Sequence, residues 1–184
     1  MHKGIVIITA LPEELAQVHL PGDIAIYYSG IGKVNATIAT MKAIHETSPS
    51  LIVNFGTAGS VQAGLQGLLP IRKALQRDVI TTMAPRGHMP YCLRPQEYTS
   101  SVDSGYTCGT GDSFVIAPDP WFDESGIEVV DMELFAIAAV AHEHGVPWLS
   151  YKYVTDYADE QAVDTWERGK HLGQQQFLDV LTKL

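Results

Sequence analysis

The sequence predicts an α/β domain of three layers, in which helices cover both faces of a mixed, largely parallel central sheet. Short apolar runs alternate with segments of helical spacing along much of the 184 residues, which is typical of βαβ units. Of the chain, 46% is hydrophobic and 18% is charged, the balance of an ordinary globular protein. Because a chain of this length buries roughly 70% of its unfolded surface, we expect one domain over residues 1–184.

The N-terminal part predicts two strands and a helix. Gly4–Thr9 is a short apolar run that we interpret as a buried first strand. Pro12, followed by two glutamates, favours the first turn of a helix, where proline is tolerated and acids offset the helix dipole. A weak alternation over Asp23–Tyr28 indicates a second strand. The next predicted helix, Val34–Glu46, has apolar residues at helical spacing, namely Val34, Ile38, Met41 and Ile44.

The middle of the chain gives a weaker signal. Leu51–Phe55 is typical of a buried strand, and it opens into Gly56–Ser60, a glycine-rich turn that lets a ligand approach the backbone. From Val61 to Ser113, prolines and polar residues interrupt the pattern, and we predict mostly loop. Because this stretch lies between core strands, we interpret residues 61–110 as a trimmed loop insertion over the site, not as a domain boundary.

Two acid-bearing segments near the C-terminus indicate where the site lies. The β-type run before Asp131 passes directly into an alanine-rich helix, so Asp131 and Glu133 are expected at a strand-to-helix junction. The predicted strand Trp148–Val154 ends just before Asp156, and open α/β sheets bind ligands at the C-terminal ends of strands. We therefore expect these carboxylates to share one pocket. An amphipathic helix over Thr165–Leu184 completes the predicted fold.

Charge, cysteine and histidine content narrow the class of partner. The formal net charge is −9 and no basic cluster occurs, which argues against a nucleic-acid surface. No apolar run reaches the length of about 18 residues that spans a bilayer, so no membrane association is expected. Cys92 and Cys108 are the only cysteines, which suits the reducing cytoplasm. The histidines lack metal-ligand spacing, so we predict no metal or cofactor. The negative net charge favours a neutral or cationic small molecule as the partner.

Five segments match, in order, the motifs of one enzyme family. They are Ala10–Glu14, Ser29–Ala36, Asn54–Gly59, Gly111–Phe114 and the pair of acid-bearing segments described above. Together they resemble the nucleoside phosphorylase superfamily and, within it, the methylthioadenosine/S-adenosylhomocysteine nucleosidases. The resemblance spans nearly the whole chain. It implies a nucleoside phosphorylase-like fold and an N-ribosyl hydrolase that splits a purine nucleoside into free base and a ribose derivative.

At the sugar end of the substrate, the resemblance implies roles for four residues. Glu14 would orient or deprotonate the attacking water, with Thr57 nearby where the family often has serine. Met132 would line the ribose. The Glu133 carboxylate would accept hydrogen bonds from both ribose hydroxyls, a geometry to which two adjacent oxygens are suited.

At the base end, the resemblance implies that Phe114 stacks on the purine and that the backbone of Val115 reads its edge. Asp156, held by Thr155, would protonate the purine N7. Lys152 stands where these nucleosidases commonly carry an arginine, and it lacks the planar fork that grips two oxygens. The water-holding network is therefore expected to differ from the family pattern.

Each of these residues also has a plain structural interpretation. Glu14 and Glu133 could offset helix dipoles, Asp156 could be a helix N-cap, and Phe114 could be ordinary core. The chemistry favours the functional interpretation, because cleavage of a ribosyl C–N bond builds positive charge on the sugar and negative charge on the base. An acid at the base, a carboxylate near the sugar and a positioned water lower that barrier.

Three functions remain open from the sequence: a hydrolase, a phosphate-dependent phosphorylase and a non-catalytic nucleoside-binding module. Leu11–Glu14 and Asn54 stand where the phosphorylases carry arginines, which favours water over phosphate. The 5′ substituent stays open between methylthio, homocysteinyl, plain deoxy and a larger group. The resemblance also implies a homodimer, in which the apolar segment Met83–Tyr91 helps to cover the neighbouring subunit's pocket.

Overall fold

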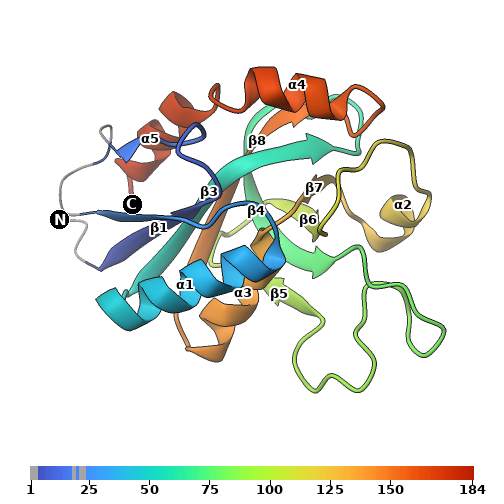
Figure 1. The fold of residues 1–184 in the computed structure, drawn as a ribbon, viewed down its shortest axis with the longest axis horizontal. Coiled ribbons are helices and arrows are strands. Elements are labelled where there is room, and N and C mark those ends of the chain that lie inside the picture. The colour runs from blue at the N-terminus through green and yellow to red at the C-terminus, as the bar shows by residue number, and fades with distance from the viewer. Residues whose placement is uncertain (1–3, 18–19, 21–23) are drawn as a thin grey trace.

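The computed structural model describes residues 4–17, 20 and 24–184, and its elements are shown in Figure 1. The strands are β1 (Ile5–Thr9), β2 (Ala25–Tyr28), β3 (Leu51–Ser60), β4 (Gly67–Gln76), β5 (Glu97–Thr99), β6 (Tyr106–Thr110), β7 (Val129–Asp131) and β8 (Trp148–Asp156). The helices are α1 (Lys33–Thr47), α2 (Trp121–Ser125), α3 (Leu134–Glu143), α4 (Ala162–Gly169) and α5 (Gln174–Leu181). No helix in the described part of the chain is long and apolar enough to cross a membrane.

All the strands belong to one mixed sheet with the order β2-β1-β3-β7-β6-β4-β5, and β8 pairs with both β3 and β4. The pairs β1–β2, β1–β3, β3–β8, β4–β6 and β6–β7 are parallel, whereas β3–β7, β4–β5 and β4–β8 are antiparallel. The predicted mixed, largely parallel sheet is confirmed. Part of the sheet closes into a barrel, because each strand in the series β3, β8, β4, β6 and β7 pairs with the next and β7 pairs again with β3.

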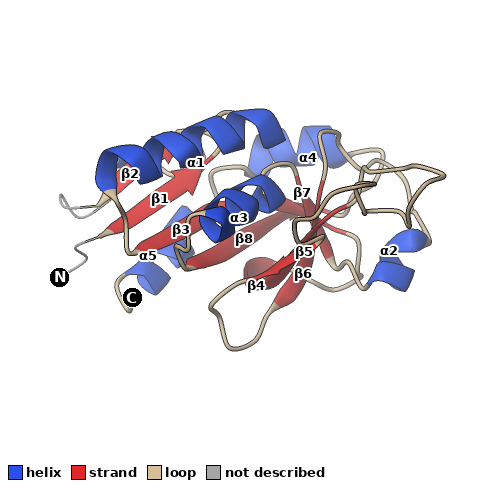
Figure 2. Ribbon diagram, turned by 90° about the horizontal axis from the view of Figure 1, so that it is seen from below, coloured by secondary structure: helices blue, strands red, loops and turns tan. Residues whose placement is uncertain are grey.

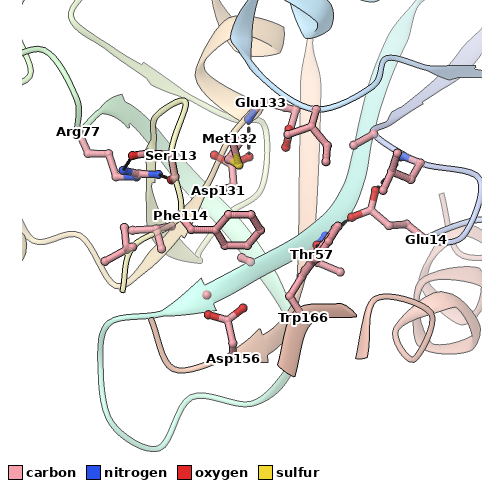
Figure 3. Close-up of a pocket in the computed structure, with 17 residues that line it drawn as sticks. Glu14, Thr57, Arg77, Ser113, Phe114, Asp131, Met132, Glu133, Asp156 and Trp166 are labelled. Carbon is pink, nitrogen blue, oxygen red and sulfur yellow. Dashed lines mark hydrogen bonds between the residues drawn. The ribbon is translucent and has the colours of Figure 1, made fainter. Parts of the chain in front are cut away.

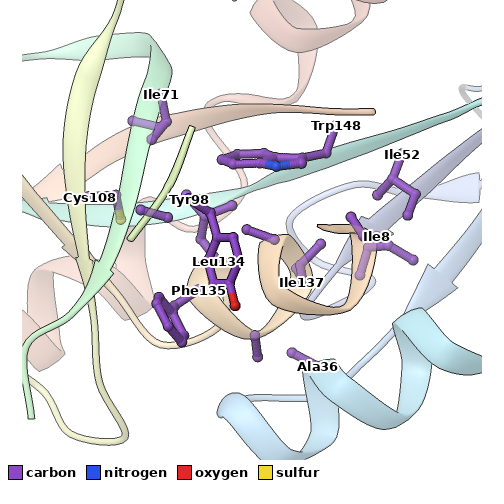
Figure 4. Close-up of a cluster of buried hydrophobic side chains, with 14 of the residues drawn as sticks. Ile8, Ala36, Ile52, Ile71, Tyr98, Cys108, Leu134, Phe135, Ile137 and Trp148 are labelled. Carbon is purple, nitrogen blue, oxygen red and sulfur yellow. The ribbon is translucent and has the colours of Figure 1, made fainter. Parts of the chain in front are cut away.

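The helices lie on two faces of the sheet, as the three-layer prediction requires (Figure 2). Side chains of β1 alternate between these faces: Val6 and Ile8 join the core beneath α1 and α3, and Ile7 joins the core beneath α5. Figure 4 shows the larger core, in which α3 packs its apolar side chains against the strands. This packing fixes the junction between β7 and α3.

Two N-terminal predictions need correction. Pro12 does not start a helix; the segment is a turn, because the Glu14 carboxylate accepts hydrogen bonds from the Thr9 hydroxyl and the Leu11 N–H. Asp23, where we expected the second strand to begin, lies outside the described residues, and β2 begins at Ala25.

Helix α1 is confirmed, but most of the apolar stripe that predicted it faces outward, and Ile44 alone of its four residues packs partly against the core. Small residues at Ala36 and Ala43 are buried, whereas Val34 is 70% exposed and Ile38 is 62% exposed. Small side chains let α1 lie close to α3 and the sheet. The larger apolar side chains are therefore left on the surface.

The middle of the chain is more regular than predicted. Gly56–Ser60 is not a turn; it continues β3, which pairs with β8 as far as Gly59 and with β7 at Gly59 and Ser60. Residues 61–110 are mostly outside helices and strands, as predicted, but they also contain three strands that the sequence did not predict, β4, β5 and β6. The predicted terminal helix is two helices, α4 and α5. Gly173 lies at the break, where a Cβ atom would come within 2.5 Å of the Tyr153 Cβ.

Candidate active site

A pocket of about 540 Å³, including its open mouth, lies where β3, β7 and β8 end, beside the loop that follows β6. Every residue that the sequence proposed for the site lines this pocket except Lys152 and Thr155. Figure 3 shows the Glu14, Glu133 and Asp156 carboxylates around the space that the Phe114 ring enters.

Glu14 is held at one end of the pocket by four hydrogen bonds. One carboxylate oxygen accepts from the Thr57 N–H at 2.9 Å and the Thr57 hydroxyl at 2.8 Å. The other accepts from the Leu11 N–H at 3.1 Å and the Thr9 hydroxyl at 3.2 Å. Glu14 is only 3% exposed, so its carboxylate is fixed in one orientation. The dipole interpretation of Glu14 fails, because no helix begins there.

Asp131 lines the inner wall of the pocket and organises the start of α3. Its Oδ2 accepts from the Leu134 N–H at 2.8 Å, and its Oδ1 accepts from the Thr110 hydroxyl at 2.5 Å. The Lys152 ammonium lies 2.7 Å from Oδ2, and both side chains are almost fully buried. Burial alone would lower the pKa of Lys152, but the charges of Asp131 and Glu133 outweigh it and raise that pKa. Lys152 is thus a buried cation outside the pocket lining, and its ion pair with Asp131 supports one wall of the pocket.

Glu133 stands between α3 and the N-terminus of α1. Its Oε1 accepts from the Gly32 N–H at 2.9 Å, and the residue is 8% exposed. Burial, followed by the neighbouring Asp131 charge, raises the pKa of Glu133 from 4.5 to about 8. This shift favours the protonated form of Glu133 near neutral pH. Hydrogen-bond donors from a ligand would favour its ionised form.

Asp156 is the last residue of β8, and its carboxyl group lies across the pocket from Glu133 (Figure 3). Its Oδ2 accepts from the Thr155 hydroxyl at 2.9 Å and its Oδ1 from the Ala158 N–H at 3.0 Å, which is why Thr155 supports Asp156 without lining the pocket. Burial raises the pKa of Asp156 although these hydrogen bonds oppose the shift, and Asp159 adds to the rise. The N-cap interpretation fails, because α4 begins at Ala162.

The loop after β6 presents the aromatic wall. Phe114 is 38% exposed, which excludes the ordinary-core interpretation. Val115 is half-buried beside it and lines the pocket. The Arg77 guanidinium holds this loop by donating to the Gly111 carbonyl at 3.0 Å and to the Ser113 carbonyl and hydroxyl.

Two pocket residues were missed by the sequence analysis. Arg77 follows β4, a strand that the sequence did not predict, so its position at the site had no local signal. Trp166, in α4, lines the pocket and donates its indole N–H to the Thr57 hydroxyl at 2.9 Å. A lone tryptophan in a predicted terminal helix gives no indication of such a contact.

Comparisons with known proteins agree with this architecture. The family model described as the phosphorylase superfamily matches residues 14–98 and 107–183. A 5′-methylthioadenosine/S-adenosylhomocysteine nucleosidase of Listeria welshimeri is 28% identical over an alignment 190 residues long, gaps included. The alignment covers 88% of this chain and 81% of that protein.

Solved structures show the same fold. The 5′-methylthioadenosine/S-adenosyl homocysteine nucleosidase of Helicobacter pylori superposes with a TM-score of 0.87 at 22% identity, covering 99% of this chain and 97% of that one. The futalosine hydrolase of Helicobacter pylori gives a TM-score of 0.87 at 23% identity, with the same coverage of 99% and 97%. The fold and the match along the sequence agree, and the chain belongs to the phosphorylase superfamily.

Proposed function

We propose that this protein is an N-ribosyl hydrolase that cleaves the N-glycosidic bond of a purine nucleoside with a modified 5′ position. The observation that carries the proposal is the buried, four-times hydrogen-bonded Glu14 carboxylate at the sugar end, opposite an acid of raised pKa, Asp156. Such a pair suits attack by water, with a base on one side and a proton donor on the other.

In the proposed reaction, the water oxygen forms a bond to the ribose C1′ while the bond between C1′ and the purine N9 breaks. Glu14 accepts the proton that water loses. Asp156 gives its proton to the purine N7, so the base leaves neutral. The raised pKa of Asp156 supports this role, because a general acid must still hold its proton near the working pH.

Glu133 and Met132 face the sugar in this proposal. One oxygen of the Glu133 carboxyl accepts the hydrogen bond from the Gly32 N–H. The carboxyl group lines the pocket, where it would accept hydrogen bonds from the two ribose hydroxyls. As the sugar becomes cationic, these hydrogen bonds and the attraction between the carboxylate and the sugar become stronger, which lowers the barrier. Phe114 stacks on the purine and the Val115 backbone contacts its edge.

The alternative is a phosphate-dependent phosphorylase, and the electrostatics of the pocket disfavour it. Phosphate needs cationic donors beside the ribose. Within the described residues, Arg77 is the cationic side chain that lines the pocket, and it donates to Gly111 and Ser113 in the loop at the base end. Lys152 is paired with Asp131. A second alternative, a nucleoside-binding module without turnover, is disfavoured by the Glu14, Glu133 and Asp156 carboxyl groups, which line the pocket together.

The substrate that we propose is 5′-methylthioadenosine, S-adenosylhomocysteine or a related 5′-modified adenosine. The names of the similar proteins support this class. Leu11 and Ile31 line the pocket near Glu14 and Glu133 and offer an apolar surface for a 5′ group. We further propose a cytoplasmic protein, supported by the free thiols of Cys92 and Cys108, with a role in methionine salvage.

A nucleoside panel tests the function. Purified protein is incubated with 5′-methylthioadenosine, S-adenosylhomocysteine, 5′-deoxyadenosine and inosine, with and without phosphate, and the free base is measured. Release of base at equal rates in both buffers is expected. Strict phosphate dependence with a ribose 1-phosphate product would make the protein a phosphorylase. Nucleoside binding without release of base would make it a binding module.

We also propose a homodimer built from one domain per chain, in which Met83–Tyr91 helps to cover the partner's pocket. In the described chain, Met83 is 62% exposed and Tyr91 is 90% exposed, so this segment presents apolar surface to solvent. The exposed stripe on α1 offers a second such surface. Sedimentation at low micromolar concentration tests this proposal, and a fully active monomer of 20.1 kDa would overturn it.

A further inference from the structure

Trp166, Thr57 and Glu14 form a hydrogen-bonded chain whose direction is fixed by chemistry. The indole N–H of Trp166 lies 2.9 Å from the Thr57 hydroxyl oxygen, which lies 2.8 Å from Glu14 Oε1. An indole can only donate, so the Thr57 oxygen must accept from it. The single hydroxyl proton of Thr57 is then free for Glu14, which as a carboxylate can only accept.

The indole is held in place on several sides. Its ring meets the Phe114 ring edge-on, with centroids 5.6 Å apart and an angle of 66° between the planes. The Lys170 ammonium lies 5.0 Å from the centre of the ring. Helix α4 also packs closely on β8, because a Cβ atom at Gly169 would lie 3.4 Å from the Thr155 side chain. Trp166 is therefore fixed relative to both ends of the pocket.

We infer that Trp166 is a positioning residue for the proposed hydrolysis, which acts through Thr57 to keep Glu14 oriented as the acceptor of the water's proton. This inference rests on the proposed function of Glu14 as the base. A hydroxyl oxygen has two lone pairs, and one that is left free beside Glu14 would compete for the hydrogen of the attacking water. The indole N–H occupies one of the two lone pairs, which makes Thr57 a weaker competitor, so the water donates to Glu14.

A double-mutant cycle tests the inference. Trp166→Phe keeps an aromatic ring and removes the N–H, while Thr57→Val removes the hydroxyl at similar volume. Trp166→Phe should lower kcat about tenfold and change KM less than about threefold, because the lost interaction acts on the chemical step. In the Thr57→Val background, Trp166→Phe should have almost no further effect, since the group through which it acts is gone.

Thr57→Ser is the matched control, because it keeps the hydroxyl. Trp166→Phe should again lower kcat about tenfold relative to this variant. The inference is overturned if Trp166→Phe retains the wild-type kcat, if it raises only KM, or if its loss of kcat is the same with and without the Thr57 hydroxyl. A rise in KM alone would make Trp166 an ordinary wall of the pocket.

The hydrogen bond between the Trp166 indole and the Thr57 hydroxyl can also be tested by an experiment that needs no substrate turnover. The chain has three tryptophans, so ¹⁵N-labelled protein gives a few indole N–H signals, and Trp166→Phe identifies the signal of Trp166. Thr57→Val should shift that signal and speed its exchange with water, whereas Thr57→Ser should keep it protected. An indole signal that does not respond to Thr57→Val would overturn the inference. A wild-type protein that hydrolyses no nucleoside would instead refute the proposed function, and the two failures are thus distinguishable.

Discussion

Replacing Glu133 by glutamine should stabilise the protein at neutral and alkaline pH while lowering its activity. The structure gives the reason, because burial and the Asp131 charge raise the pKa of Glu133 from 4.5 to about 8. Between these values the folded chain holds a proton that the unfolded chain has lost. Stability therefore falls as the pH rises through this window, by at most about 1.4 kcal/mol per pH unit.

The expected magnitude follows from this slope. From about pH 5.5 to about pH 7.5, the wild-type protein should lose roughly 2–3 kcal/mol of unfolding free energy relative to Glu133→Gln, which cannot ionise. The other titrating groups are common to both proteins, so the difference between the two curves isolates Glu133. The glutamine can still accept the hydrogen bond from the Gly32 N–H.

Urea unfolding of the ligand-free proteins at several pH values within this range measures the effect. Glu124→Gln, at an exposed position of α2, is the matched control and should stay within about 0.5 kcal/mol of the wild type throughout. If the difference between wild type and Glu133→Gln does not change with pH, Glu133 is not a buried carboxyl of raised pKa. Both substrate binding and turnover of Glu133→Gln should be weaker, because the carboxylate contacts to the ribose are lost.

Three further substitutions probe the other groups. Asp156→Asn should lower turnover roughly 10²-fold or more in a base-release assay while calorimetry still detects nucleoside binding; near-normal turnover would exclude Asp156 as the acid. Lys152→Met should destabilise the fold by about 3–5 kcal/mol in urea, because the buried Asp131 charge loses its cationic partner, and adding Asp131→Asn should recover part of the loss. Equal stability of the single variant and the wild type would contradict this. Gly59→Ala puts a methyl group 2.6 Å from Asp156 Oδ1, so turnover should fall with little change in secondary structure by circular dichroism, and unchanged turnover would speak against the tight contact.

The sequence was sufficient where a segment carries its own signal. The apolar run of β1, the length of α1 and the strand-to-helix junction at Asp131 were all predicted, because each depends on local patterning. The stripe on α1 shows the limit of such patterning. Its spacing identified the helix, yet the buried face is the small-residue face.

The strands of the middle region were missed because their stability comes from distant partners. β4 contains Pro70, Arg72 and Lys73, which hide the alternation that a strand normally shows. It is held by β6 and β8, and the pairing with β8 joins residues more than eighty positions apart, such as Leu69 and Lys152. No window of sequence contains such a pairing. Most of the residues proposed for the site line one pocket, because the motifs that resemble the family carry them.

The glycines of β3 explain why this strand resembled a turn in sequence. A glycine inside a strand normally weakens it, so Gly56 and Gly59 indicated a break. In the structure, a Cβ at Gly56 would lie 3.3 Å from the Lys152 ammonium and 3.5 Å from Glu14 Oε1, and one at Gly59 would lie 2.6 Å from Asp156 Oδ1. The two acids thus approach the same strand at places where side chains are missing. Pairing with β8 as far as Gly59 and Asp156 keeps the strand extended despite its glycines. The feature that obscured the fold in the sequence is therefore the one that lets the proposed base and the proposed acid reach one pocket.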